Sequence, residues 1–314
     1  MANGFKDEEY DLLRHRIDEL MELSRQSSIP LDEELGSLLK RIDVLHEECY
    51  QHLSGWEKVQ LSRHPNRPTT LEYITAWCDE WAELHGDRLY GDDPALIGGL
   101  ARLDNRAITW LGHQKGRGTQ DNLLRNFGMP HPEGYRKAHR LVLQAEKFGR
   151  PVLTLINTPG AYPGIGAEAR GQAWAISSML SLLSRVRVPV VAVVTGEGGS
   201  GGALALGLAD YLIMLSNSVF SVASPEACSA ILFRDASKVQ EVAGHLGLTA
   251  QELLSYGIVD EIIEEPVGGV QQHPEKVTAD IKQAVTAQFS RLCTIDPDTL
   301  VARRRERLYK FSSF

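Results

Sequence analysis

Apolar residues recur at two different spacings along this chain, and the change of spacing divides it. In residues 7–60 they return every three or four positions, which is the spacing of an amphipathic helix. The series comprises Tyr10, Leu13, Ile17, Leu20 and Leu23, is broken at Ile29-Pro30, and resumes with Leu31, Leu35, Leu38, Ile42, Leu45 and Cys49. Charged residues fill the other faces. The pattern predicts a helical hairpin that packs on its own chain or contacts another subunit.

From about residue 95, short runs rich in β-branched residues alternate with helical patterns. The predicted strands are 95–101, 107–111, 152–156, 190–195, 211–215, 219–222 and 258–263, and the main helices between them are 135–148, 166–186 and 249–256. Thr69–Glu72 and Thr249–Glu252 have the form of capping boxes at helix starts. This alternation predicts an α/β domain with much parallel sheet, which is either doubly wound or a spiral of ββα turns.

Composition narrows the class of protein. The chain has 314 residues, of which 43% are hydrophobic and 24% charged, as in ordinary soluble proteins. A net charge of −8 argues against nonspecific nucleic-acid binding. The sequence shows no apolar run long enough for a membrane span and no signal-peptide core at its start. The four cysteines (Cys49, Cys78, Cys228 and Cys293) are scattered, so we expect neither a zinc site nor disulfides, and a cytoplasmic location.

The strongest chemical signal follows the predicted strand at 190–195. The sequence Gly196-Glu197-Gly198-Gly199-Ser200-Gly201-Gly202 leads into a short apolar helix. The glycines are expected to let the backbone turn sharply without a β-carbon to block a ligand. Free N–H groups in the first turn of the helix would then face that turn, which predicts a preorganised oxyanion site. Glu197 is the one ionisable residue of the loop and is interpreted as structural.

Two other motifs overlap the same residues. Gly196, Gly198 and Gly201 match the dinucleotide fingerprint, but the following helix is too short and no acid stands at the required distance for a ribose. Gly198–Gly202 also matches the serine nucleophile elbow, with Asp235 or Asp260 and His273 in the right order for a triad. Nothing around these residues marks a triad, so Ser200 is interpreted as a small residue in a tight turn.

Two further segments carry candidate chemistry. Asn157–Gly166 is a second glycine-rich loop after a buried strand, and it is expected to face the same pocket as residues 196–202. Lys115 and Arg117 follow another strand, with further basic residues nearby at Arg125, Arg136, Lys137 and Arg140. They could contact an anionic group such as a coenzyme A phosphate, or form a solvated basic face.

Several ordered motifs resemble the α subunit of bacterial acetyl-CoA carboxylase carboxyltransferase. They are Trp56–Pro65, Arg67–Tyr73, Gly112–Gly116, Asn126–Pro130, Pro132–Ala138, Asn157–Gly164 and Gly196–Ala205, and they cover nearly the whole chain. The resemblance implies a crotonase-type spiral of ββα units with a helical extension. Its expected parts are the extension at 1–66, the carboxyltransferase domain at 67–295 and a helical tail at 296–314.

The resemblance also implies an activity and its partners. The family transfers a carboxyl group from carboxybiotin, held on a biotin carboxyl carrier protein, to acetyl-CoA and forms malonyl-CoA. A zinc-ribbon β subunit would complete an α2β2 assembly, served by a biotin carboxylase, and this chain would hold no metal.

When the family pattern is aligned with this sequence, the resemblance implies that the oxyanion hole for the biotin ureido oxygen is formed by Gly201 and Gly202. Substrate contacts are expected at Gly160, Ala161, Tyr162, Gly164, Gly198, Gly199 and Ala203. Another acyl-CoA enzyme of this fold remains an alternative, although a hydratase would need a glutamate where this chain has Leu204. A serine hydrolase using Ser200 and a purely structural subunit are further alternatives.

Overall fold

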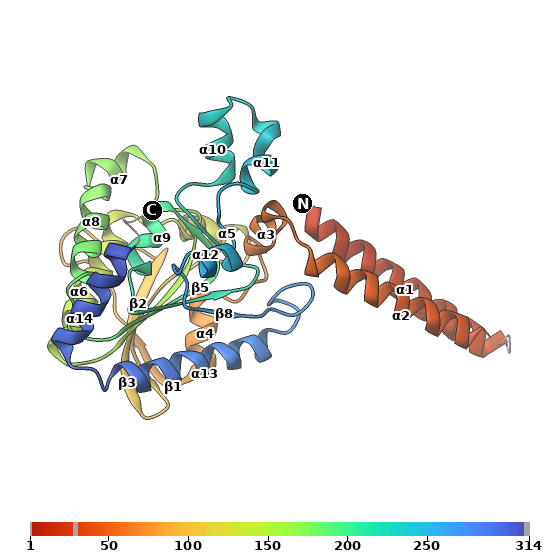
Figure 1. The fold of residues 1–314 in the computed structure, drawn as a ribbon, viewed down its shortest axis with the longest axis horizontal. Coiled ribbons are helices and arrows are strands. Elements are labelled where there is room, and N and C mark those ends of the chain that lie inside the picture. Colours follow the sequence, from red (N-terminus) through yellow and green to blue (C-terminus); the bar gives the residue numbers. More distant parts are fainter. Residues whose placement is uncertain (1, 28–30, 311–314) are drawn as a thin grey trace.

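The computed structural model describes residues 2–27 and 31–310, and its chain forms an α/β body with a long helical arm (Figure 1). The arm is the predicted hairpin, made of α1 (Ala2–Ser27) and α2 (Asp32–Gln51). Its predicted break at Ile29-Pro30 lies outside the described residues. The Tyr10 ring stacks on His46 with centroids 3.8 Å apart, and its hydroxyl donates to Asp43 at 2.6 Å, so the two helices are joined by more than apolar contact.

The body is built on one eight-stranded mixed sheet. Its strands are β1 (Cys78–Glu83), β2 (Leu96–Leu103), β3 (Arg106–His113), β4 (Val152–Thr158), β5 (Val190–Gly199), β6 (Tyr211–Leu215), β7 (Val219–Ser221) and β8 (Glu261–Ile263). The spatial order is β1-β2-β3-β4-β5-β6-β8, and β7 pairs with the far end of β5. The first three strands pair antiparallel, and the order from β3 to β8 is parallel as predicted.

Helices cover both faces of the sheet. They are α3 (Gly55–Ser62), α4 (Thr70–Trp77), α5 (Gly118–Leu124), α6 (Pro132–Lys147), α7 (Ile165–Ala169), α8 (Gln172–Leu183), α9 (Ser200–Gly207), α10 (Pro225–Leu232), α11 (Val239–Ala243), α12 (Ala250–Ser255), α13 (Pro274–Leu292) and α14 (Pro297–Lys310). One apolar core joins the sheet to α6, α8, α9 and α12, and a second joins it to α4 and α13. No helix in the described part of the chain is long and apolar enough to cross a membrane.

Two predicted elements differ from the structure. The expected helix at 166–186 is divided into α7 and α8, because Gly171 adopts a left-handed conformation (φ 83°) between them. Strand β1 was not predicted, since its sequence Cys-Asp-Glu-Trp-Ala-Glu contains no β-branched residue and three acidic ones. It lies at the edge of the sheet, where charged side chains can face solvent.

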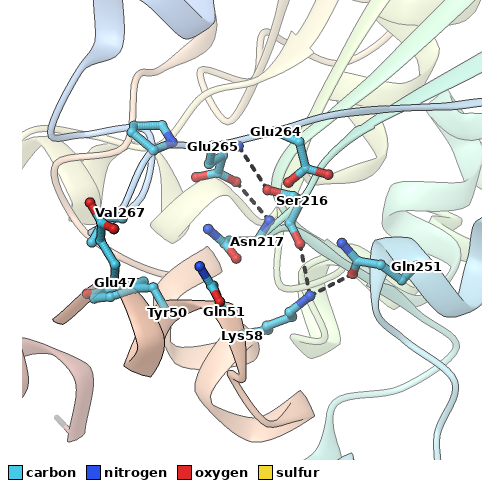
Figure 2. A pocket seen from close by; sticks show the side chains of 11 residues that line it. Glu47, Tyr50, Gln51, Lys58, Ser216, Asn217, Gln251, Glu264, Glu265 and Val267 are labelled. Carbon is cyan, nitrogen blue, oxygen red and sulfur yellow. Dashed lines mark hydrogen bonds between the residues drawn. The ribbon is translucent and has the colours of Figure 1, made fainter. Parts of the chain in front are cut away.

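The arm meets the body at a polar pocket of about 420 Å³ (Figure 2). Lys58 on α3 donates to the Ser216 carbonyl at 3.3 Å and to Gln251 Oε1 at 2.6 Å. Burial lowers the pKa of Lys58, although nearby glutamates oppose the shift. These contacts attach the connecting helix α3 to the carboxyl end of β6 and to α12.

Candidate functional site

The predicted oxyanion segment lies at the junction of β5 and α9, but its backbone is not the expected glycine turn. Residues 196–199 continue β5 in extended conformation, where Gly198 pairs with Thr158 on β4 and Phe220 on β7. Helix α9 begins directly afterwards at Ser200, whose φ of 54° makes the reversal. The prediction that the glycines turn the chain was therefore wrong, because a serine makes the turn.

The glycines instead allow the backbone after β4 and the backbone after β5 to approach each other closely. A β-carbon on Gly199 would lie 2.0 Å from the Pro159 carbonyl oxygen. One on Gly202 would lie 2.5 Å from the Ala161 nitrogen. Because real β-carbons do not approach backbone atoms this closely, the two loops after β4 and β5 can pack directly on each other only with glycine at these positions.

Helix α9 presents free backbone donors at this junction. The first N–H groups of a helix have no partner inside it, and Gly201 and Gly202 occupy this first turn. Gly201 lines a cavity, with its α-carbon open toward Ile176, whereas Gly202 and Ala203 are buried. The predicted residues therefore lie at a helix start, and their role as an oxyanion site stays a prediction.

Backbone groups of the loop after β4 are held by hydrogen bonds. The Gly160 N–H donates to Thr158 Oγ1 at 3.1 Å, and the Tyr162 N–H donates to the Pro130 carbonyl at 3.0 Å. Gly164 caps α7 beside the Tyr162 ring. Neither of the two cavities at this junction is lined by Gly160, Ala161, Tyr162 or Gly164, and their predicted role in substrate binding stays a prediction.

An apolar cavity of about 410 Å³ opens at the first turn of α9. It is lined by Ser200, Gly201, Leu204, Phe220, Ser221, Val222, Leu246, Gly247, Leu253, Tyr256 and Ile258. Among these described residues there is no carboxylate, imidazole, amine or guanidinium. Backbone donors at an uncharged pocket can stabilise a developing oxyanion, but the lining offers no side chain suited to proton transfer near neutral pH.

A second cavity of about 320 Å³ lies on the other side of the junction and is lined by both loops. Asn157 and Pro159 contribute from the first loop, and Glu197 from β5. Arg63 binds Glu197 at 2.7 Å, and Lys115 Nζ lies 3.9 Å from the same carboxylate. Burial lowers the pKa of Lys115 to about 8, with Glu197 opposing the shift. The structural interpretation of Glu197 agrees with these contacts.

The other basic residues named from the sequence are engaged inside the protein. Arg117 binds Glu72 at 2.5 Å and the Pro65 carbonyl at 2.6 Å, so it helps to fix α4. The remaining four make these contacts: Arg125 with Asp121, Arg136 with Asp87 and Glu133, Lys137 with Asp92, and Arg140 with the carbonyls of His85 and Gly86. These basic residues are thus paired within the chain, although the Arg117 side chain stays 42% exposed.

The residues of the alternative serine triad are not assembled. Asp260 accepts from the Leu212 N–H at the start of β6, which is the opposite end of the sheet from Ser200. His273 lines a pocket beside the arm, and Asp235 caps a short helix. Among the residues that the structure describes, no group of three or more potential metal ligands is found.

Comparisons with known proteins identify the family of the chain. The family model of acetyl co-enzyme A carboxylase carboxyltransferase-like proteins matches residues 5–312. The carboxyl transferase subunit alpha of Syntrophomonas wolfei acetyl-coenzyme A carboxylase is 52% identical over 302 residues, which cover 96% of this chain and 95% of the relative. The corresponding protein of Thermus thermophilus is 47% identical over 299 residues, with 95% and 96% covered.

Comparison with solved structures shows that the similarity includes the fold. A Pseudomonas malonate decarboxylase hetero-tetramer in complex with coenzyme A gives a TM-score of 0.59 at 17% identity, covering 80% of this chain and 95% of that one. Transcarboxylase 12S gives 0.54 at 21% identity and covers 68% of this chain, which spans 42% of the longer protein. The chain therefore has the crotonase-type α/β fold and belongs to the acetyl-CoA carboxylase carboxyltransferase family.

Proposed function

We propose that this chain is the α subunit of an acetyl-CoA carboxylase carboxyltransferase and binds the carboxybiotin end of the reaction. The observation that carries the proposal is the first turn of α9, where Gly201 opens onto an apolar cavity whose lining has no carboxylate, imidazole, amine or guanidinium. Biotin has an apolar ring system with one polar ureido oxygen, and this combination matches an apolar cavity with backbone donors at its edge.

The residues present suit the charge that the reaction develops. When bound, carboxybiotin supplies the carboxyl group and leaves negative charge on its ureido oxygen. The N–H groups of Gly201 and Gly202 would donate to that oxygen, and one such donor is worth about 2.7–4 kcal/mol of barrier in other enzymes. Because the packed loops fix these groups before the substrate arrives, little reorganisation is needed at the moment of reaction.

A partner chain is needed to complete the site. Acetyl-CoA must also develop an oxyanion when its methyl group loses a proton, and the described residues offer one glycine pair at a helix start. We therefore propose that a zinc-ribbon β subunit supplies the second oxyanion hole and most of the coenzyme A contacts in an α2β2 assembly. A biotin carboxyl carrier protein and a biotin carboxylase would serve this assembly in the cytoplasm.

A hydratase of the same fold is the second candidate. It would need a carboxylate at the cavity, and the corresponding position holds the half-exposed Leu204. Adding water across a double bond requires a side-chain acid and base, which the described lining does not provide. The cavity therefore favours carboxyl transfer.

The chain alone is expected to be inactive. Purified chain would be mixed with carboxybiotin and acetyl-CoA, with and without the β subunit, and malonyl-CoA would be measured. We expect formation only in the mixture, together with zinc that travels with the β subunit. Efficient malonyl-CoA formation by the lone chain, or hydration of an enoyl-CoA by the complex, would overturn the proposal.

A further inference from the structure

Gln172 is a buried side chain next to the loop after β4, and no motif in the sequence assigns it a role. It is the first residue of α8, follows the left-handed Gly171, and is 8% exposed. The turn before it is anchored to α6, because Arg136 donates to the Arg170 carbonyl at 3.0 Å and Arg170 Nε donates to Glu133 at 2.8 Å. Helix α8 itself packs against α9 (Figure 1). Gln172 therefore extends from a fixed point of the fold.

The amide nitrogen of Gln172 holds the loop after β4 through two hydrogen bonds. Nε2 donates to the Tyr162 carbonyl at 2.9 Å and to the Pro130 carbonyl at 2.8 Å. The Tyr162 N–H donates to the same Pro130 carbonyl at 3.0 Å, so the backbone of Tyr162 is fixed on both sides. Gln172 Oε1 is buried and has no hydrogen-bond partner among the described residues. The amide nevertheless has one sensible orientation, because the reverse would place its oxygen against two carbonyl oxygens.

Tyr162 directly follows the residues that pack against α9. A β-carbon on Gly202 would lie 2.5 Å from the Ala161 nitrogen and 2.6 Å from the Gly160 carbonyl carbon. The peptide that joins Gly160 to Ala161 therefore packs directly on the first turn of α9, with no side chain between them. A shift of Tyr162 would move this peptide, and the first turn of α9 would lose its support on that side.

We propose that Gln172 is a positioning residue, which holds residues 160–162 against the first turn of α9 and so fixes the direction of the Gly201 and Gly202 N–H groups. The proposal rests on the proposed function. Gln172 lines neither cavity at the junction, so it acts through the loop and not on a substrate. An error of about 1 Å in the placement of a reacting or binding group can cost about 100-fold in rate.

Gln172→Met and Gln172→His separate the hydrogen bonds from the shape of the side chain. Methionine has nearly the shape of glutamine without a donor, whereas histidine carries an N–H at Nε2, as many bonds from the backbone as the glutamine nitrogen. In the complex with the β subunit, Gln172→Met is expected to lose about 10- to 100-fold in kcat. Its KM for acetyl-CoA should stay within about twofold, and Gln172→His should recover at least about threefold in kcat over Gln172→Met.

Thr154→Val provides the matched control, because it also removes a buried donor to a backbone carbonyl and keeps the side-chain shape. Thr154 Oγ1 donates to the Leu206 carbonyl at 2.7 Å, near the other end of α9. This variant is expected to lower the melting temperature and leave kcat near the wild-type value. A loss of kcat that follows melting temperature across the three variants, or equal kcat in Gln172→Met and Gln172→His at equal melting temperature, would overturn the role of Gln172.

Hydrogen exchange of the complex tests the positioning without turnover. The amides of Gly160 and Tyr162 should exchange faster in Gln172→Met than in the wild-type and Thr154→Val proteins, because their hydrogen bonds depend on the position of the loop. Equal rates in the three proteins would contradict the inference. A wild-type complex that makes no malonyl-CoA would refute the proposed function, whereas the exchange comparison would still decide whether Gln172 holds the loop.

Discussion

At the scale of single residues, the small residues at the junction of β5 and α9 are required for two different reasons. Gly199 and Gly202 are needed because neighbouring backbone occupies the space of a β-carbon. Ser200 takes the left-handed conformation, which is uncommon for residues other than glycine. Gly201 meets neither constraint, because a β-carbon added there would come no closer than 3.7 Å, to the Ile176 side chain. Substitutions at these positions should therefore have different effects.

Alanine at Gly202 and at Gly201 should change stability in opposite directions. Gly202→Ala places a methyl group against the backbone of residues 160 and 161, and overpacking of this kind costs about 1–3 kcal/mol. Gly201→Ala makes only an ordinary contact with Ile176 at a helical position and should stabilise by about 0.4–1 kcal/mol. Urea unfolding of the two variants checks this, and an equal loss in both would contradict the packing argument.

Ser200 should tolerate small replacements and reject a branched one. Ser200→Ala and Ser200→Gly are expected to keep most of the activity of the assembled enzyme, because the hydroxyl has no triad partner. Ser200→Val should lose about 1–3 kcal/mol of stability, since a β-branched side chain is strained at positive φ. Initial rates and thermal unfolding measure both effects. Near-complete loss of turnover in a folded Ser200→Ala enzyme would instead indicate a nucleophile.

At the scale of secondary-structure elements, polar anchors decide where the helices sit. Arg304 of α14 is 2% exposed and binds Asp210 through two nitrogens at 2.5 and 2.8 Å. It also donates to the carbonyls of Leu183, the last residue of α8, and Val186, three residues further on. Asp210 in turn accepts from the Val190 N–H at the start of β5. The C-terminal helix therefore reinforces the strand that leads to the site.

Removing the Arg304 guanidinium should loosen this helix strongly. Arg304→Met leaves the buried Asp210 carboxylate without its partner, and breaking a buried ion pair in this way costs about 3–5 kcal/mol. The exposed neighbour Arg305 is the control, and Arg305→Met should change stability by less than about 0.5 kcal/mol. Denaturant unfolding followed by circular dichroism measures both. Similar midpoints for the two variants would show that the anchor is unimportant.

At the scale of the whole molecule, buried ionisable groups set how stability depends on pH. The folded pKa of His113, about 3, lies well below its ordinary value near 6.5. Between these values the unfolded chain binds a proton that the folded chain does not. Stability due to this group is therefore present above about pH 6.5 and is lost as the pH falls toward 3.

Replacing His113 should flatten the acid side of the stability profile. Over this range the free energy of unfolding of the wild-type chain should fall with pH by up to about 1.4 kcal/mol per unit more than that of His113→Gln, because glutamine cannot titrate. Urea unfolding at several pH values from 7 to 4 gives the two slopes. The same background of Asp and Glu titration occurs in both proteins, so the difference isolates His113. Parallel profiles would mean that the imidazole ionises freely in the folded state.

The sequence alone determined the parts of this protein that depend on local chemistry. The capping boxes at Thr69 and Thr249 begin α4 and α12 as predicted, because their hydrogen bonds span three residues. The parallel strands were predicted from β-branched runs that are buried on both faces. Ordered motifs identified the family and located the candidate oxyanion turn, since these patterns are contiguous in the chain.

The tertiary structure decided what depends on residues far apart in the chain. It showed that Gly199 and Gly202 exist for contact with residues 159–161, that Arg63 holds Glu197, and that Arg117 binds Glu72. It also buried the His113 side chain at the end of β3, where burial lowers its pKa. A contact between distant residues leaves no periodic or contiguous pattern in a single sequence. Such contacts are fixed when the sheet and its covering helices pack, and they determine the geometry of the candidate site.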